Sequence, residues 1–143
     1  MRAHLISTCP ARLPGTSTGS AGNDVIVSSR GNNTIIGYGA NDIVCAGGSN
    51  DDVTMAGDND QIDGGACNDM LRGGCGDDLL FAGDGDDTLS GGAGGDALSA
   101  DAGADTRGRN AGITDRCDGG DGTDAFAGGS IVASGCEDVI GIP

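Results

Sequence analysis

Aspartate recurs at every ninth residue along most of this chain, and carboxylates at a fixed spacing are suited to binding metal ions. Glycines precede most of these aspartates, so backbone carbonyls become accessible beside the carboxylates. A hard cation such as Ca²⁺ binds about six to eight oxygens of these two kinds. The recurring carboxylates are therefore candidate ligands for a hard cation. The residues at this spacing are Asp24, Asn33, Asp42, Asp51, Asp60, Asp69, Asp78, Asp87, Asp96 and Asp105.

The aspartates belong to a nine-residue unit that repeats without insertion or deletion over residues 19–108. Its clearest copy, residues 73–81, reads Gly-Gly-Cys-Gly-Asp-Asp-Leu-Leu-Phe, with aspartate at position six and an aliphatic residue at position eight. Self-similarity at a fixed period is typical of stacked repeats. Position eight is occupied in turn by Ile26, Ile35, Val44, Val53, Ile62, Leu71, Leu80, Leu89, Leu98 and Arg107.

This unit resembles the RTX, or haemolysin-type, calcium-binding nonapeptide Gly-Gly-x-Gly-x-Asp-x-U-x. The resemblance covers about two-thirds of the chain and returns at residues 119–127. It implies an all-β fold, a parallel β-roll (right-handed β-solenoid) with two units per coil. It also implies that each ion is shared between aspartates one coil apart, such as Asp60 with Asp78. The ligands implied in this way are Asp42, Asp51, Asp60, Asp69, Asp78, Asp87, Asp96, Asp105 and Asp124, with the turn glycines Gly64, Gly73, Gly76, Gly83, Gly85, Gly91 and Gly94.

Each half of the unit has a separate structural role. Glycines at positions one, two and four suit a turn that needs φ > 0. Alternation along a strand directs position eight inward and positions seven and nine outward. In the first half of the array, Ala40, Ser49, Asp58 and Cys67 replace the fourth-position glycine. Calcium sites in residues 19–58 are therefore expected to be weak or absent.

Asparagine recurs at position five from Asn23 to Asn68. This row would form a flat ice-binding or adhesive edge, or would simply stabilise the turns beside the aspartates. No threonine row accompanies it, which favours the turn interpretation.

The composition excludes several classes of function. The chain has 143 residues, 30 glycines, 2% aromatic residues and a net charge of −15. Such acidity argues against nucleic acid or an anionic membrane as partner. No stretch approaches the roughly 20 apolar residues of a membrane-spanning helix. Acidic Gly-rich chains are often disordered linkers, but the regular aliphatic column argues against that interpretation.

The flanks divide the chain into three parts. Residues 1–18 are expected to form an extended N-terminal arm; they lack the apolar core of a signal peptide. Residues 19–108 form the array of ten units. Residues 109–143 are read as degenerate repeats and a cap. One residue inserted there brings Cys117 to position eight, and the next unit brings Asp124 to position six and Phe126 to position eight.

Six cysteines in a chain that resembles secreted RTX proteins suggest disulfides, whose connectivity does not follow from sequence alone. Placed on a β-roll, Cys9 could pair with Cys45, and Cys117 with Cys136. Cys67 and Cys75 fall in successive turns on opposite edges, so their Cα atoms are expected to exceed the roughly 7 Å limit of a disulfide.

These observations favour a secreted, non-catalytic, monomeric β-roll that folds when several Ca²⁺ ions bind. One aliphatic side chain per nine residues offsets little of the backbone entropy lost on folding, so metal must contribute. No nucleophile–base pair is visible, since His4 is the lone histidine. Two alternatives stay open: a calcium-binding tail of a larger secreted RTX enzyme or toxin, and an adhesion or ice-binding module. Apolar outward residues, including Val25, Val27, Ile43 and Phe81, suggest that the N-terminal arm or a protein partner covers one sheet.

Overall fold

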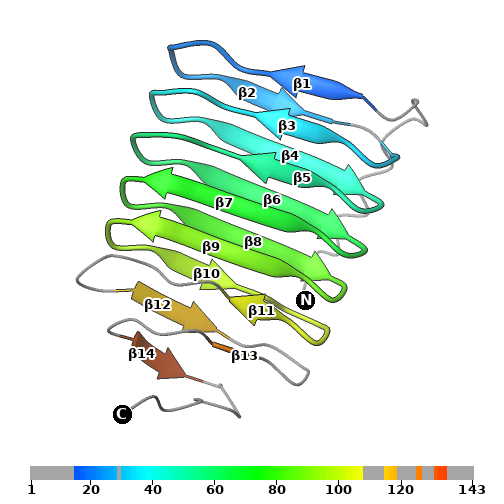
Figure 1. Ribbon diagram of the computed structural model, residues 1–143, viewed down its shortest axis with the longest axis vertical. Coiled ribbons are helices and arrows are strands. Elements are labelled where there is room, and N and C mark those ends of the chain that lie inside the picture. The colour runs from blue at the N-terminus through cyan, green and yellow to red at the C-terminus, as the bar shows by residue number, and fades with distance from the viewer. Residues whose placement is uncertain (1–14, 29, 108–114, 119–124, 127–130, 135–143) are drawn as a thin grey trace, which may run out of the picture.

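The computed structural model describes residues 15–28, 30–107, 115–118, 125–126 and 131–134. Within them the chain forms two parallel sheets of seven strands each, stacked face to face as a β-solenoid (Figure 1). One sheet has the order β1-β3-β5-β7-β9-β11-β13, and the other β14-β12-β10-β8-β6-β4-β2. The strands are β1 (Thr16–Thr18), β2 (Val25–Val27), β3 (Thr34–Ile36), β4 (Ile43–Gly48), β5 (Asp52–Thr54), β6 (Gln61–Ala66), β7 (Met70–Cys75), β8 (Leu79–Asp84), β9 (Thr88–Ala93), β10 (Ala97–Ser99), β11 (Thr106–Arg107), β12 (Asp115–Asp118), β13 (Ala125–Phe126) and β14 (Ile131–Ser134).

The strand register confirms two repeats per coil. Val44 pairs with Ile62, and Leu71 with Leu89, each an offset of two units. After residue 108 the offset grows by the one inserted residue, because Leu98 pairs with Cys117. The prediction that Cys117 enters the position-eight column is therefore confirmed.

The roll begins earlier than expected. β1 pairs with β3 in the same register as the later coils, so residues 16–18 belong to the roll and not to an N-terminal arm. The reason is that Thr16 to Thr18 can fill positions seven to nine of a half-unit ahead of the first complete repeat. The remainder of the expected arm, residues 1–14, lies outside the described residues.

The core is a single file of aliphatic side chains between the sheets. Position-eight residues from Ile35 to Leu98 are buried, with at most 2% of the side chain exposed. Ala46, Met55, Ala82 and Ala100 at position one are buried beside them. Positions seven and nine point outward, as Val25 and Val27 show by their exposure. The predicted inward and outward pattern is confirmed.

The turns use φ > 0 at positions two and four, as predicted, but not at position one. Gly74 and Gly83 at position two, and Gly76 and Gly85 at position four, all have positive φ. Where position four is not glycine the chain still adopts a left-handed conformation, with φ of 69° at Asp58 and 80° at Ser49. No first-position glycine has positive φ, so the conformational reason expected for that column is wrong.

Replacing Ala40 by glycine is expected to raise the free energy of unfolding by about 0.5–1 kcal/mol, measured by urea denaturation in the presence of calcium. Ala40 has φ 75°, where a Cβ is strained and glycine is not. The backbone N–H that donates to Asp58 Oδ2 at 3.0 Å is retained. Ala66→Gly is the control, because Ala66 lies in β6 without positive φ and should lose stability. A loss at residue 40 as well would contradict the strain argument.

Among the described residues, no helix has the length and apolar character that crossing a membrane requires.

Candidate metal centre

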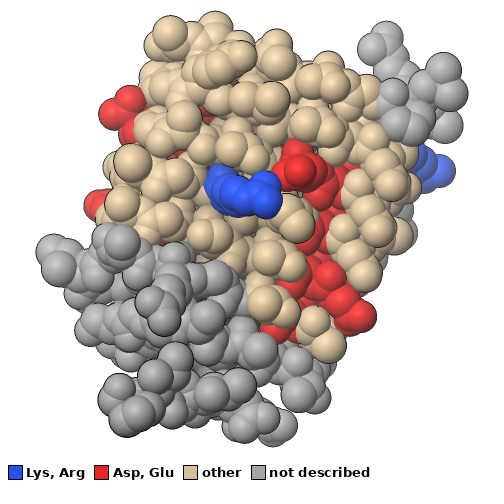
Figure 2. Space-filling view, viewed as in Figure 1, with Lys and Arg blue, Asp and Glu red and all other residues tan. Residues whose placement is uncertain are grey.

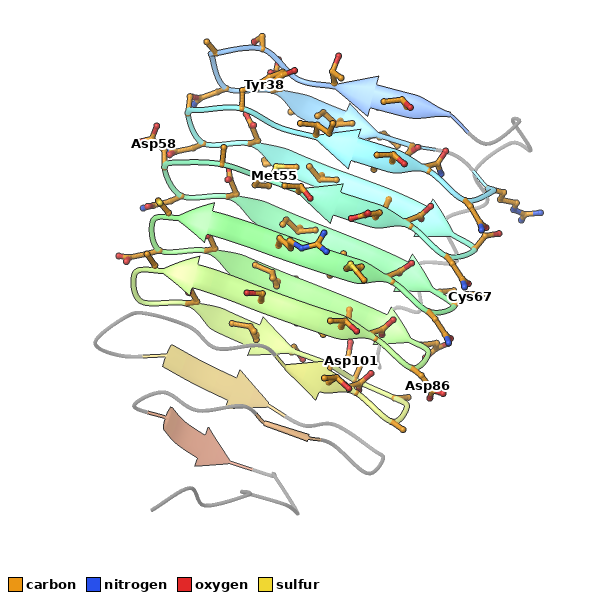
Figure 3. The ribbon with its side chains drawn as sticks, viewed as in Figure 1. Tyr38, Met55, Asp58, Cys67, Asp86 and Asp101 are labelled. Carbon is orange, nitrogen blue, oxygen red and sulfur yellow. The ribbon has the colours of Figure 1, made fainter. Side chains whose placement is uncertain are left out.

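The turns place the sixth-position aspartates in two stacks, one along each edge of the roll. Units with an even number form one edge, near Cys67, Asp86 and Asp101, and units with an odd number form the other, near Tyr38 and Asp58 (Figure 3). Position six has the same parity as position eight, so its side chain points between the sheets. The aspartates from Asp42 to Asp105 are accordingly 1–4% exposed.

Aspartates one coil apart are joined by a direct hydrogen bond. The backbone N–H of Asp60 donates to Asp78 Oδ1 at 2.9 Å, and that of Asp69 donates to Asp87 Oδ1 at 2.7 Å. The same bond recurs along both edges and confirms that residues 18 apart in sequence are neighbours in space. Sequence reasoning missed this ladder, in which Oδ1 serves the backbone.

The second carboxylate oxygen has no such partner in several coils. Oδ2 of Asp51, Asp69, Asp78 and Asp87 is buried and accepts no hydrogen bond from the described residues. A buried charged oxygen without a donor carries a large desolvation cost. These atoms therefore need a cation or a proton nearby.

Backbone carbonyls approach the same points as these oxygens. A Cβ added to Gly64 would lie 2.7 Å from Asp69 Oδ2 and 2.8 Å from the carbonyl oxygen of Ala82. A Cβ added to Gly73 would lie 2.7 Å from the carbonyl oxygen of Gly91 and would collide with Asp78 Oδ2. Carboxylate and carbonyl oxygens together are the ligands that Ca²⁺ prefers, so the residues fit that ion. These close contacts also explain the glycines at position one, Gly64 and Gly73, because a side chain there would fill the space beside Oδ2.

The predicted glycine ligands have several different roles in the structure. The Gly91 carbonyl lies beside a candidate site, whereas the Gly83 carbonyl accepts a hydrogen bond from Ala102 at 3.2 Å. The structure adds the carbonyl of Ala82, which sequence reasoning missed because a carbonyl ligand does not depend on side-chain type; its position-one register could have indicated it. Asp124 lies outside the described residues. Calcium ligation by the predicted residues stays a prediction. Gly64 and Gly73 leave room beside carboxylates, and four of the predicted glycines have positive φ: Gly76, Gly83, Gly85 and Gly94.

Burial raises the pKa of these carboxyl groups. The pKa of Asp69 is raised to about 7 and that of Asp87 to about 6, first by desolvation and then by neighbouring aspartates, against the lowering effect of the ladder hydrogen bond. The pKa values of Asp51, Asp60 and Asp78 are raised for the same leading reason. Acidic side chains gather in a band that runs down the visible face (Figure 2). The site thus has a strong demand for positive charge.

No group of three or more His, Cys, Asp or Glu side chains converges within the part of the chain that the structure describes. A side-chain cluster of that kind is typical of transition-metal sites. The oxygens described above instead combine one or two carboxylates with main-chain carbonyls.

The fifth-position asparagines form a second ladder that runs in the opposite direction. The Asn59 N–H donates to Asn41 Oδ1, and the Asp77 N–H donates to Asn59 Oδ1, both at 2.9 Å. Their oxygens thus stabilise neighbouring turns, as expected. Gly95 donates to Asp77 Oδ1 at 2.8 Å and carries no side chain to continue the ladder.

The cysteine predictions are tested only in part. Cys67 and Cys75 are exposed free thiols. Cys67 lies between β6 and β7, and Cys75 is the last residue of β7, at the opposite edge of the roll. Cys45 lies in β4 at an outward position. Cys9 and Cys136 lie outside the described residues, so both suggested disulfides stay predictions.

Gly73→Ala is expected to weaken calcium binding at Asp78 and to lower the stability of the calcium-loaded protein by about 1–3 kcal/mol. The new methyl group would occupy the space between Asp78 Oδ2 and the Gly91 carbonyl. Isothermal titration and thermal unfolding measure the two effects. Gly57→Ala is the matched control, because a Cβ there meets nothing within 4 Å. Equal behaviour of the two variants would show that the space beside Asp78 does not matter.

Comparison with known proteins agrees with this geometry. The model of the RTX calcium-binding nonapeptide repeat family (4 copies) matches residues 18–53, 56–80 and 73–106, which together span more than half of the chain. No curated protein and no solved structure gives a match.

Proposed function

Because the chain belongs to the family of RTX calcium-binding nonapeptide repeats, we propose that it is a secreted, non-catalytic protein whose β-roll folds when several Ca²⁺ ions bind. The observation that carries the proposal is the row of buried Oδ2 atoms of Asp51, Asp69, Asp78 and Asp87, which accept no hydrogen bond from the residues that the structure describes. A divalent cation beside them would neutralise charge that otherwise opposes folding.

Ca²⁺ would supply positive charge and oxygen coordination between successive coils. The Asp69 and Asp78 carboxylates, with the carbonyls of Ala82 and Gly91, would contribute ligands. The remaining position-six aspartates would act in the same way where their oxygens stay accessible. Oδ1 would continue to hold the backbone of the preceding coil, so the protein keeps its register while Oδ2 binds metal.

The absence of catalysis is proposed from the chemistry of the chain. His4 is its lone histidine, and the described turns bring together aspartates and glycines but no nucleophile with a base. Secretion is supported by the calcium requirement, because calcium is abundant outside cells. If the chain is the calcium-binding tail of a larger enzyme or toxin, the catalytic or toxic activity resides in another part of that protein.

A contact surface is supported by one observation. Val25 and Val27 are 72% and 64% exposed on β2, and Ile43 on β4 is 45% exposed. Such an exposed apolar area on one sheet favours contact with a partner protein or with another segment of the chain. An adhesive function would bind through the same area. Apart from such a partner, we propose that the protein is a monomer.

Isothermal titration of the metal-free chain with CaCl₂ tests the calcium-binding role. Several ions per chain should bind, with a parallel rise in β-sheet signal by circular dichroism. A chain that shows no heat of binding and no gain of structure would rule out the proposal. Expression with a native upstream region, followed by assay of medium and cells, tests secretion.

A further inference from the structure

The first coils differ from the later ones in the atoms that lie beside the position-six side chains. In later coils Oδ2 of Asp69 and of Asp78 is buried and accepts no hydrogen bond within the described part of the chain. In the first coils the chain places its own groups at the equivalent points. Three residues provide them: Ser20, Asn33 and Met55.

Asn33 places an amide where a cation would bridge oxygens. It occupies position six, is 4% exposed, and its Nδ2 donates to the Gly31 carbonyl at 2.5 Å and to Asp51 Oδ1 at 3.1 Å. These acceptors are a turn carbonyl and Oδ1 of Asp51, the oxygen that also accepts the ladder bond from the Asn33 backbone N–H. Asn33 therefore has an uncharged amide, which makes its own hydrogen bonds, where later units have the second oxygen of a carboxylate.

Met55 fills the corresponding space on the other edge. It directly follows β5 and is 3% exposed (Figure 3). A Cβ added to Gly37 would lie 2.8 Å from Asp42 Oδ2 and 3.1 Å from Met55 Cε, and would collide with Met55 Sδ. At Gly73 the equivalent space is faced by a backbone carbonyl of the next coil. A neutral thioether thus occupies the space beside Asp42 where a later coil presents a hard oxygen.

Ser20 serves the first carboxylate. Its backbone N–H donates to Asp24 Oδ2 at 2.5 Å, and its hydroxyl donates to the same atom at 2.9 Å. Asp24 Oδ2 is therefore hydrogen-bonded by the protein, unlike Oδ2 of Asp69 or Asp78. A cation there would have to displace both donors.

We infer that Ser20, Asn33 and Met55 are built-in substitutes for calcium, and that they close the sites of the first coils to the ion. This inference rests on the proposed function and assigns it to the later coils, at Asp51, Asp69, Asp78 and Asp87. The roll then has a metal-independent end, whose interactions form with the chain alone, and a metal-dependent end. Calcium binding would fold the metal-dependent end onto the metal-independent end, which is already formed.

The test is to reopen the closed sites and count ions by isothermal titration and native mass spectrometry. Asn33→Asp removes the amide donors, and Met55→Gly removes the thioether. Each is expected to raise the number of bound Ca²⁺ by one relative to the unaltered chain. Asn32→Asp adds the same charge at an exposed neighbouring position, and Met55→Leu keeps the space filled. Neither control should gain an ion.

The outcomes separate the two proposals. If the unaltered chain binds calcium but neither reopened variant gains an ion, the substitution idea is overturned and the proposed function stands. If Met55→Gly fails to fold, Asn33→Asp decides alone, because it preserves side-chain size. A gain in the Asn32→Asp control equal to that of Asn33→Asp would also overturn the inference. A chain that binds no calcium at all would overturn both.

Discussion

Chelation with excess EGTA at about pH 7.5 is expected to abolish most of the β-sheet signal of this chain, and added Ca²⁺ is expected to restore it. The reason lies in the position-six column. Oδ2 of Asp51, Asp69, Asp78 and Asp87 is buried and has no hydrogen-bond donor among the described residues. Each of these carboxylates would carry charge in the metal-free protein. One file of aliphatic side chains is too little apolar burial to offset that cost together with the backbone entropy.

The measurement is far-UV circular dichroism with metal content checked by atomic absorption. Mg²⁺ at equal concentration is the control ion, because it demands short octahedral geometry and keeps its waters; it should restore little structure. A spectrum unchanged after the metal is shown to be absent would contradict the expected coupling. Amide hydrogen exchange adds a spatial readout, since β8 and β9 lie in the coils with open carboxylates and should lose protection.

The architecture could be predicted because a period-nine sequence offers few folds. The aliphatic column from Ile35 to Leu98 needs a common interior, and glycine at positions two and four needs positive φ. The offset of two units per coil, and the single insertion before Cys117, then follow from keeping both columns in register. These features depend on residue type and spacing, which the sequence displays directly.

The details of the site could not be predicted in this way. First-position glycine was expected to serve backbone conformation, yet Gly73 serves space, because Asp78 Oδ2 approaches its Cα. The Ala82 carbonyl carries no side-chain signal. Met55 reads from sequence as an ordinary core residue, and only three-dimensional placement shows it beside Asp42. The hydrogen bond from a backbone N–H to Oδ1 of the aspartate in the next coil was likewise not predictable, because it depends on how far successive coils are displaced from each other.

In the absence of calcium, acidification from about pH 8 to about pH 4.5 is expected to increase the β-structure of the chain. Burial raises the pKa of Asp69 from 3.8 to about 7 and that of Asp87 to about 6 in the folded state. A raised folded-state pKa means that the native chain holds protons more tightly than the unfolded chain does. The stabilisation is therefore complete below about pH 4 and is lost as pH rises through about 6 to 7.

The same protons compete with calcium, so calcium affinity should fall over this window while the metal-free fold gains stability. Asp69→Asn imitates the protonated acid and should stabilise the metal-free chain at about pH 7.5 while weakening calcium binding. Asp52→Asn changes an exposed carboxylate, paired with Arg72 at the surface, and should have little effect on either.

General charge repulsion is the competing explanation, because the chain carries a net charge of −15. About 1 M NaCl at neutral pH screens exposed charges strongly and buried ones weakly. If salt alone restores the structure that acid restores, surface repulsion is responsible and the buried carboxylates are not. If acid and Asp69→Asn succeed where salt fails, then unneutralised charge inside the roll is what keeps the metal-free chain unfolded.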